Sequence, residues 1–212
     1  MTEKILILDF GSQYTQLIAR AIREANVYCE IVPFHKEIEF TDDLKGVILS
    51  GSPFSVNDEK APEVNIRKIA QQRSVLGICY GAQLTSKQFG GRVERSEKRE
   101  YGRAQLNITS SNTLLENIPS NSQVWMSHGD SILELPQQAK ICAITDSIPV
   151  AAFQLSEADC NDIYGLQFHP EVYHSSYGKQ IIQNFLYKIC GCNGDWTPAH
   201  FISDTVNALK AQ

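Results

Sequence analysis

The stretch Ser74-Val75-Leu76-Gly77-Ile78-Cys79-Tyr80-Gly81-Ala82-Gln83 decides the fold class of this 212-residue chain. It begins with a short, mostly apolar run, which is typical of a strand buried on both faces. Two glycines bracket Cys79 and let the backbone turn sharply there. A helix is expected from about Ala82 to Phe89, ending at Gly90-Gly91. The stretch therefore predicts a strand, a tight turn and a helix of an α/β sheet.

The N-terminal part of the chain shows the same alternation. Residues 4–8 form a continuous apolar run that predicts a buried strand. A helix is expected after it, with Ser12 as its N-cap. Further strands are expected at residues 27–33 and 46–50. A β-α-β opening of this length implies parallel strands with right-handed crossovers. The apolar side chains of the first helix recur at helical spacing: Leu17, Ile18, Ala21, Ile22 and Ala25.

The rest of the chain predicts more strands than helices. One helix is expected over residues 61–72, with Pro62 in its first turn, and another over 177–189. A last amphipathic segment carries apolar residues from Phe201 to Leu209. Short strands are expected at 104–109, 124–127, 141–145, 150–154 and 163–168. We therefore expect one α/β domain over residues 1–212, with three layers: a mostly parallel central sheet, helices on both faces and some antiparallel additions.

Composition excludes several classes of protein. The chain has 19 basic and 24 acidic residues, a net charge of −5, and 42% hydrophobic residues. This acidic balance argues against a nucleic-acid partner. The basic cluster Arg92–Arg99 is interleaved with glutamates, and we expect a solvated loop there. Because no apolar run reaches about 18 residues, we expect no membrane partner. Six cysteines without CxxC spacing or a secretion signal indicate reduced thiols and a cytoplasmic protein.

Cys79 is the candidate nucleophile. It lies in the pattern glycine-x-nucleophile-x-glycine at a strand-to-helix turn, which presents the side chain at the end of the strand. The helix dipole favours a thiolate at that position. A buried structural cysteine between two packing glycines is the alternative interpretation.

His169 and Glu171 are the candidate base and its orienting residue. Pro170 favours an extended backbone at His169, and residues two apart on an extended chain point the same way. Glu171 can then hold one nitrogen of the imidazole while the other nitrogen faces a thiol, as in a catalytic triad. The strand before His169 places both residues where α/β sheets bind ligands. A surface turn is the alternative.

The turn at Ser50-Gly51-Ser52-Pro53 also follows a predicted strand and can offer a free backbone N–H to an oxyanion. His128 follows an apolar strand and is expected to be structural or to contact substrate. No metal-binding spacing is present, and neither GxxxxGK[ST] nor GxGxxG occurs.

Together these segments resemble the class I glutamine amidotransferase family, whose triad members use a cysteine nucleophile. The resemblance is carried by Gly77–Gln83 and Gln167–Glu171, in the order nucleophile, histidine, and glutamate two residues later. Ile7–Arg20 and Val124–Asp130 resemble the members that serve the amination of xanthosine monophosphate (XMP) to guanosine monophosphate (GMP). Residues 193–198 resemble the segment that leads into the second domain of those enzymes.

The resemblance implies hydrolysis of L-glutamine to glutamate and ammonia. It implies that Cys79 is the nucleophile, that His169 is the general base and acid, and that Glu171 orients His169. It places the backbone N–H groups of Ser52 and Tyr80 at the oxyanion. For glutamine binding it implies three further residues: Gln83, Gly129 and Asp130.

One departure from the family is visible. The family usually has Gly-Gly-Pro where this chain has Gly51-Ser52-Pro53. A serine restricts the φ/ψ range of the backbone more than a glycine does, so the turn is expected to take an inactive geometry when no partner is present.

The resemblance also implies a partner. We expect no cofactor and no metal in residues 1–212, and we expect ATP and Mg²⁺ in an ATP-pyrophosphatase synthetase domain or subunit that takes up the ammonia. The chain is expected to be either a fragment of a two-domain enzyme or a free-standing subunit. Three alternatives stay open: an amidotransferase of another synthetase, such as anthranilate or carbamoyl phosphate synthase; a catalytically silent regulatory module; and a cysteine hydrolase acting on γ-glutamyl bonds without a partner.

Overall fold

The computed structural model describes residues 2–199, except for the side chains of residues 96–100. The amphipathic segment expected from Phe201 to Leu209 lies outside the described residues. The strands are β1 (Lys4–Asp9), β2 (Tyr28–Pro33), β3 (Leu44–Leu49), β4 (Ser74–Ile78), β5 (Arg92–Ile108), β6 (Ser122–Glu134), β7 (Ala139–Ile144), β8 (Ala152–Leu155) and β9 (Ile163–Leu166). The helices are α1 (Thr15–Glu24), α2 (Ile66–Ala70), α3 (Tyr80–Gln88), α4 (Gly178–Gln183) and the π-helix η1 (Asn184–Ile189), which continues α4.

The described strands form a mixed sheet in the order β2-β1-β3-β4-β9-β8-β7-β5-β6. β2, β1, β3, β4 and β9 are parallel to one another. β8, β7, β5 and β6 extend the sheet through antiparallel pairs. The expected strands at 4–8, 46–50 and 74–78 are present as β1, β3 and β4, which are adjacent and parallel. The carboxyl ends of β4 and β9 meet at one edge, and Cys79 and His169 follow these two strands.

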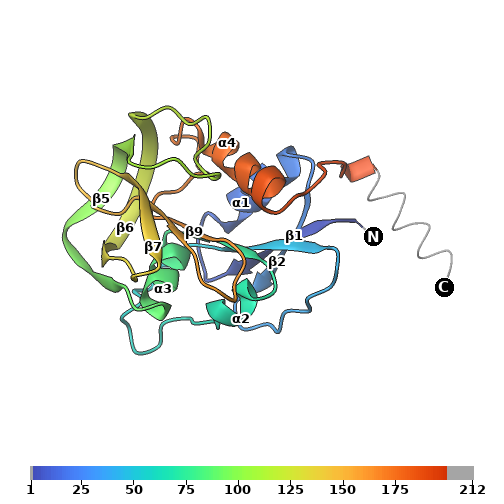
Figure 1. Cartoon of the computed structure of the whole chain (residues 1–212), viewed down its shortest axis with the longest axis horizontal. Helices are drawn as coiled ribbons and strands as arrows, with labels where there is room; N and C mark the ends of the chain where they lie inside the picture. The colour runs from blue at the N-terminus through green and yellow to red at the C-terminus, as the bar shows by residue number, and fades with distance from the viewer. Residues whose placement is uncertain (1, 200–212) are drawn as a thin grey trace.

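The parallel strands are buried on both faces because their side chains alternate between two cores. Ile5 and Ile7 of β1 pack in a cluster with residues of α1, α4 and η1. Leu6 and Leu8 pack on the other face with residues of α2 and α3. Figure 1 shows the sheet between these two helical layers, which is the expected three-layer α/β architecture.

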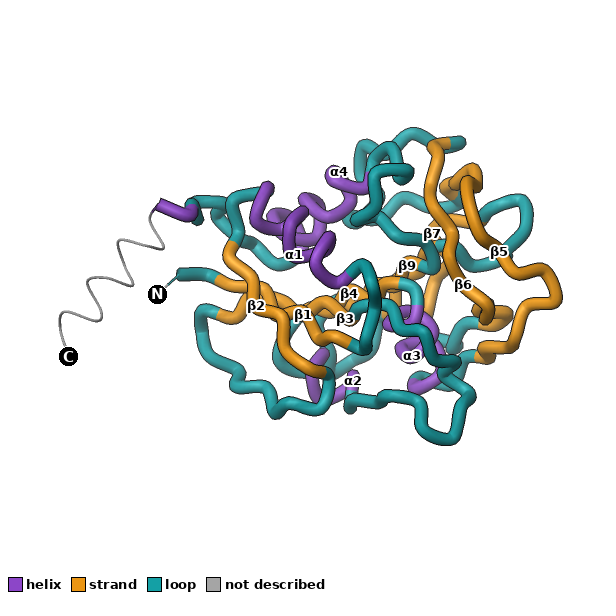
Figure 2. Tube along the Cα trace, turned by 180° about the vertical axis from the view of Figure 1, so that it is seen from behind, coloured by secondary structure: helices purple, strands orange, loops and turns teal. Residues whose placement is uncertain are grey.

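β5 and β6 form a long antiparallel ribbon at one end of the sheet (Figure 2). The loop expected over Arg92–Arg99 is therefore wrong, because these residues belong to β5. Val93 is buried opposite Ile132, while Arg92 forms a 2.6 Å ion pair with Glu134. Charged residues are compatible with a strand here because one side of an antiparallel ribbon can face solvent.

Two local predictions about helices are also wrong. The helix expected over 61–72 is only the five residues of α2. The segment before it is held by side chains of α3: the Tyr80 hydroxyl donates to the Pro62 carbonyl, and the Gln88 amide donates to the Val64 carbonyl, both at 2.7 Å. Ser12 is not the N-cap of α1, which begins at Thr15 after Tyr14. The Ser12 hydroxyl instead accepts the Tyr14 N–H at 3.0 Å.

Candidate active site

Cys79 lies at the strained turn between β4 and α3. Its φ of 53° is in the left-handed region, which is uncommon for a residue with a side chain. Its N–H donates to the Leu166 carbonyl at 2.7 Å, which ties the turn to the end of β9. The flanking glycines permit close packing: a Cβ at Gly77 would lie 2.6 Å from backbone atoms of α3, and one at Gly81 would lie 2.5 Å from the Leu49 carbonyl oxygen. The turn therefore requires both glycines.

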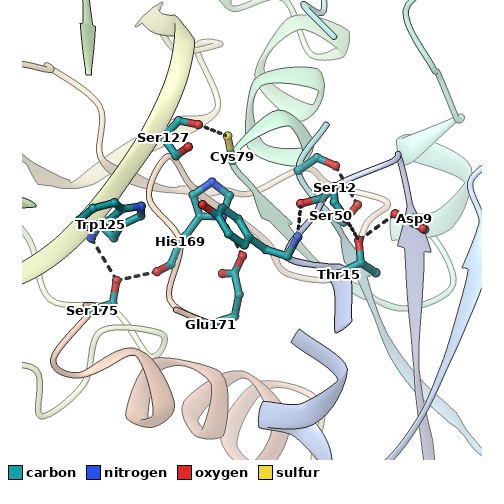
Figure 3. A network of polar contacts seen from close by, with 12 residues as sticks. Asp9, Ser12, Thr15, Ser50, Cys79, Trp125, Ser127, His169, Glu171 and Ser175 are labelled. Carbon is teal, nitrogen blue, oxygen red and sulfur yellow. Dashed lines mark hydrogen bonds and ion pairs between the residues drawn. The ribbon is translucent and has the colours of Figure 1, made fainter. Parts of the chain in front are cut away.

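His169 and Glu171 form a buried pair beside Cys79. The Nδ1 atom of His169 lies 2.7 Å from Oε1 of Glu171, and their side chains are only 3% and 1% exposed. In Figure 3 the imidazole ring lies between Cys79 and Glu171. The ring of Tyr14 packs edge-on against the imidazole, with 4.9 Å between the ring centroids. The three residues that the sequence predicted as a triad are therefore brought together.

The charges around His169 favour the imidazolium. Burial by itself lowers the pKa of His169, but the Glu171 carboxylate and the Cys79 thiolate outweigh it and hold this pKa well above its usual value. Burial raises the pKa of each of the other five cysteines, to about 11 for Cys29 and about 12 for Cys192. The surroundings of His169 thus favour its protonated, imidazolium form.

Ser175, which the sequence analysis did not single out, fixes the backbone of His169. Its hydroxyl donates to the His169 carbonyl at 2.5 Å and accepts the Trp125 N–H at 3.1 Å. The His169 N–H in turn donates to the Trp125 carbonyl at 3.0 Å. Figure 3 shows this bridge between β6 and the segment after β9. A single buried serine carries no sequence signal for such a role, because one of its partners, Trp125, lies 50 residues away in the chain.

The turn that carries Ser52 packs against the start of the helix that carries Tyr80. The Gly81 N–H donates to the Ser50 carbonyl at 3.2 Å, which places the turn after β3 against the first turn of α3. Within the described part of the chain, neither the Ser52 nor the Tyr80 N–H donates to a protein acceptor. Ser52 is not among the non-glycine residues with positive φ, so its side chain imposes no left-handed strain on this turn.

A cleft of about 790 Å³ opens above the sheet edge and is lined by Cys79 and His169. The predicted substrate-binding residues Gln83, Gly129 and Asp130 also line it, as does Ser52. The Gln83 side-chain amide donates to the backbone carbonyl of Asp130 at 2.8 Å. The structure therefore brings six of the eight predicted site residues to one cleft, whereas Glu171 and Tyr80 do not line it.

His128 lies on β6 and also lines the cleft. Burial lowers its pKa to about 4, so this imidazole is neutral at pH 7. His174 stacks on Trp125 with 4.5 Å between ring centroids. Among residues 2–199 no group of three or more histidine, cysteine, aspartate or glutamate side chains is placed to hold a metal ion. The helices in this range are all too short or too polar to cross a membrane.

The fold and the site define the class of the protein. The chain belongs to the class-I glutamine amidotransferase family, whose match extends over residues 6–189. Among its curated relatives, a protein named GMP synthase [glutamine-hydrolyzing] from Cytophaga hutchinsonii is 52% identical over 213 residues, and one of the same name from Phocaeicola vulgatus is 54% identical. Each match covers 100% of this chain and 41% of the relative, so the chain spans about two-fifths of their length.

Solved structures agree with this assignment. A protein assigned as one of the subunits of a GMP synthase, from Thermoplasma acidophilum, has a TM-score of 0.72 and 31% identity, covering 90% of this chain and 94% of that one. A glutamine amidotransferase from Thermotoga maritima has a TM-score of 0.68 at 19% identity, covering 90% of this chain and 99% of that one. The second likeness shows the fold alone.

Proposed function

We propose that residues 1–212 are a glutamine amidotransferase domain that hydrolyses L-glutamine to glutamate and ammonia through a thioester on Cys79. The observation that carries the proposal is the buried pair of His169 and Glu171 beside Cys79, in a cleft at the carboxyl edge of the sheet. The family of the chain and the names of its relatives support the same reaction.

In the first half of the proposed reaction, the Cys79 thiolate attacks the side-chain amide carbon of glutamine. His169 donates its proton to the amide nitrogen, the carbon–nitrogen bond breaks, and ammonia leaves. In the second half, His169 removes a proton from water, which attacks the thioester and releases glutamate with a free thiol. The raised pKa of His169 suits the first half, because the imidazolium is the proton donor.

The backbone N–H groups of Ser52 and Tyr80 are the proposed oxyanion donors. Each is expected to contribute about 3 kcal/mol to the transition state, by analogy with other acyl-transfer enzymes. Both groups lack a protein acceptor within residues 2–199, so they are available to the developing negative charge.

Gln83, Gly129 and Asp130 are proposed to bind the amino-acid end of glutamine. Gln83 and Asp130 are joined by the bond from the Gln83 amide to the Asp130 carbonyl, which fixes the two residues relative to each other. The Asp130 carboxylate has the charge that an α-ammonium group requires.

We further propose that the ammonia passes to an ATP-pyrophosphatase synthetase domain or subunit, which aminates XMP to GMP in the cytoplasm. ATP and Mg²⁺ then belong to that synthetase, and this domain needs no cofactor. The names of the relatives and their greater length support this assignment. The free thiols of the described cysteines are consistent with a reducing compartment.

The variant Cys79→Ala tests the proposal. In the presence of the synthetase, glutamine-dependent formation of GMP from XMP and ATP should fall by several orders of magnitude, because the thioester cannot form. Ammonium chloride at raised pH should still support the reaction, since free ammonia bypasses this domain. Retained glutamine-dependent activity would show that Cys79 is not the nucleophile. Loss of both activities in a folded variant would contradict the division of labour between the two parts.

A further inference from the structure

Arg95 lies in the cleft but has no place in the proposed reaction. It belongs to β5 and pairs directly with Asp130 of β6 in the antiparallel register. Directly paired residues project from the same face of a ribbon, so the guanidinium and the Asp130 carboxylate share one side of the cleft. Of the residues between 2 and 199 that line the cleft, Arg95 is the single lysine or arginine.

The two opposite charges do not neutralise each other. The Asp130 carboxylate accepts a hydrogen bond from the Ser55 hydroxyl, and the Ser55 N–H donates to Asp58 at 2.9 Å. The loop that carries these residues is fastened to the ribbon, because the Asn57 amide donates to the Val93 carbonyl at 2.9 Å. Arg95 forms no ion pair or side-chain hydrogen bond with the described residues. Its charge is therefore available to a ligand.

One wall of the cleft carries the hydrogen-bonded carboxylate of Asp130 and the guanidinium of Arg95. Such a wall is complementary to a zwitterion. Free glutamine is a zwitterion at its amino-acid end, with an ammonium and a carboxylate on the same carbon. A guanidinium can hold a carboxylate through two parallel hydrogen bonds, which a lysine cannot match in geometry.

We infer that Arg95 binds the α-carboxylate of glutamine while Asp130 holds its α-ammonium group. The inference rests on the proposed function and adds a determinant of specificity to it. A glutamine residue inside a peptide has no free α-carboxylate, so Arg95 selects free glutamine over glutaminyl residues of proteins.

The test measures binding without turnover in the 212-residue chain carrying Cys79→Ala. Calorimetric titrations with L-glutamine and with L-glutamine α-amide, which lacks the carboxylate charge, are compared for this parent and for a second substitution, Arg95→Gln. Arg103→Gln is the matched control, because Arg103 lies on the same strand, is exposed and does not line the cleft. Arg95→Lys separates the charge from the two-pronged geometry.

Arg95→Gln should raise the Kd for L-glutamine about ten- to one-hundredfold, the range of a hydrogen bond to a charged group. It should leave the Kd for the α-amide unchanged, and Arg103→Gln should change neither value. Arg95→Lys should give an intermediate Kd for glutamine. An unchanged Kd for glutamine in Arg95→Gln, or an equal rise in Kd for both ligands, overturns this inference and leaves the proposed function standing. A parent chain that binds no glutamine overturns the proposed function and the inference with it.

Discussion

Replacing Glu171 by glutamine measures what the buried carboxylate contributes to catalysis. Its oxygen lies 2.7 Å from Nδ1 of His169 in a nearly dry environment. With about 4 Å between the charge centres and an effective dielectric constant of about 20, the attraction is about 4 kcal/mol. The neutral amide retains a hydrogen bond of about 1 kcal/mol. The net loss of about 3 kcal/mol predicts a glutaminase kcat lower by about two orders of magnitude.

The same substitution has a pH signature. The Glu171 charge helps to raise the pKa of His169, so the variant's imidazole should lose its proton at lower pH than the wild-type imidazole. Alkylation of Cys79 by iodoacetamide at a series of pH values reports this change.

The substitution should also change how stability depends on pH. A group whose pKa is raised on folding stabilises the protein below its unfolded pKa, about 6.5 for histidine, and this stabilisation is lost as pH rises through the folded pKa. The variant's deficit in unfolding free energy should therefore be largest near pH 6 and shrink at higher pH. A folded variant with wild-type kcat and an unchanged alkylation profile would refute the reasoning.

Two further predictions concern the framework around the site, the second with a control substitution. Ser175→Ala removes the hydroxyl that donates to the His169 carbonyl, and we expect a kcat about tenfold lower, on the scale of one lost hydrogen bond. A circular-dichroism melt shows whether the variant is still folded. An unchanged kcat would contradict the positioning role of Ser175. Gly81→Ala places a Cβ 2.5 Å from the Leu49 carbonyl oxygen and should lower the free energy of unfolding in urea by about 1–3 kcal/mol or more. As a control, the Cβ added by Gly129→Ala meets nothing within 4 Å, so the urea midpoint should not change.

The parallel half of the sheet was predictable because its strands are continuous apolar runs. Residues 4–8 and 74–78 need no knowledge of their neighbours to be identified as buried, since both faces are apolar. The closeness of the three proposed triad residues was predictable for a related reason. Cys79 directly follows β4, His169 and Glu171 come within five residues of the end of β9, and parallel strands bring their carboxyl ends to one edge.

The remaining features depend on contacts between distant parts of the chain. The segment before α2 is non-helical because Tyr80 and Gln88 bond its carbonyls, which helical periodicity cannot reveal. The charged start of β5 is a strand because it pairs with β6, and its local composition resembles a loop. Arg95 lies in the cleft because of that same pairing. Its position beside Asp130 could not be predicted before the strand register was known.

The cleft has two walls: the β5–β6 ribbon forms one, and the turns at the carboxyl ends of the parallel strands form the other. β5 joins the rest of the sheet through the pairs of Asn107 with Ile144 and Ile108 with Ala143, whereas Cys79 stands on the parallel strands. Cleft-facing ribbon positions such as Arg95 can therefore vary without touching the turn that carries Cys79, whereas Trp125 of the same ribbon accepts the His169 N–H and is constrained with the site. The two walls can therefore evolve at different rates: substrate preference can change at cleft-facing positions of the ribbon, while the turn at Cys79 stays fixed by the interior of the sheet.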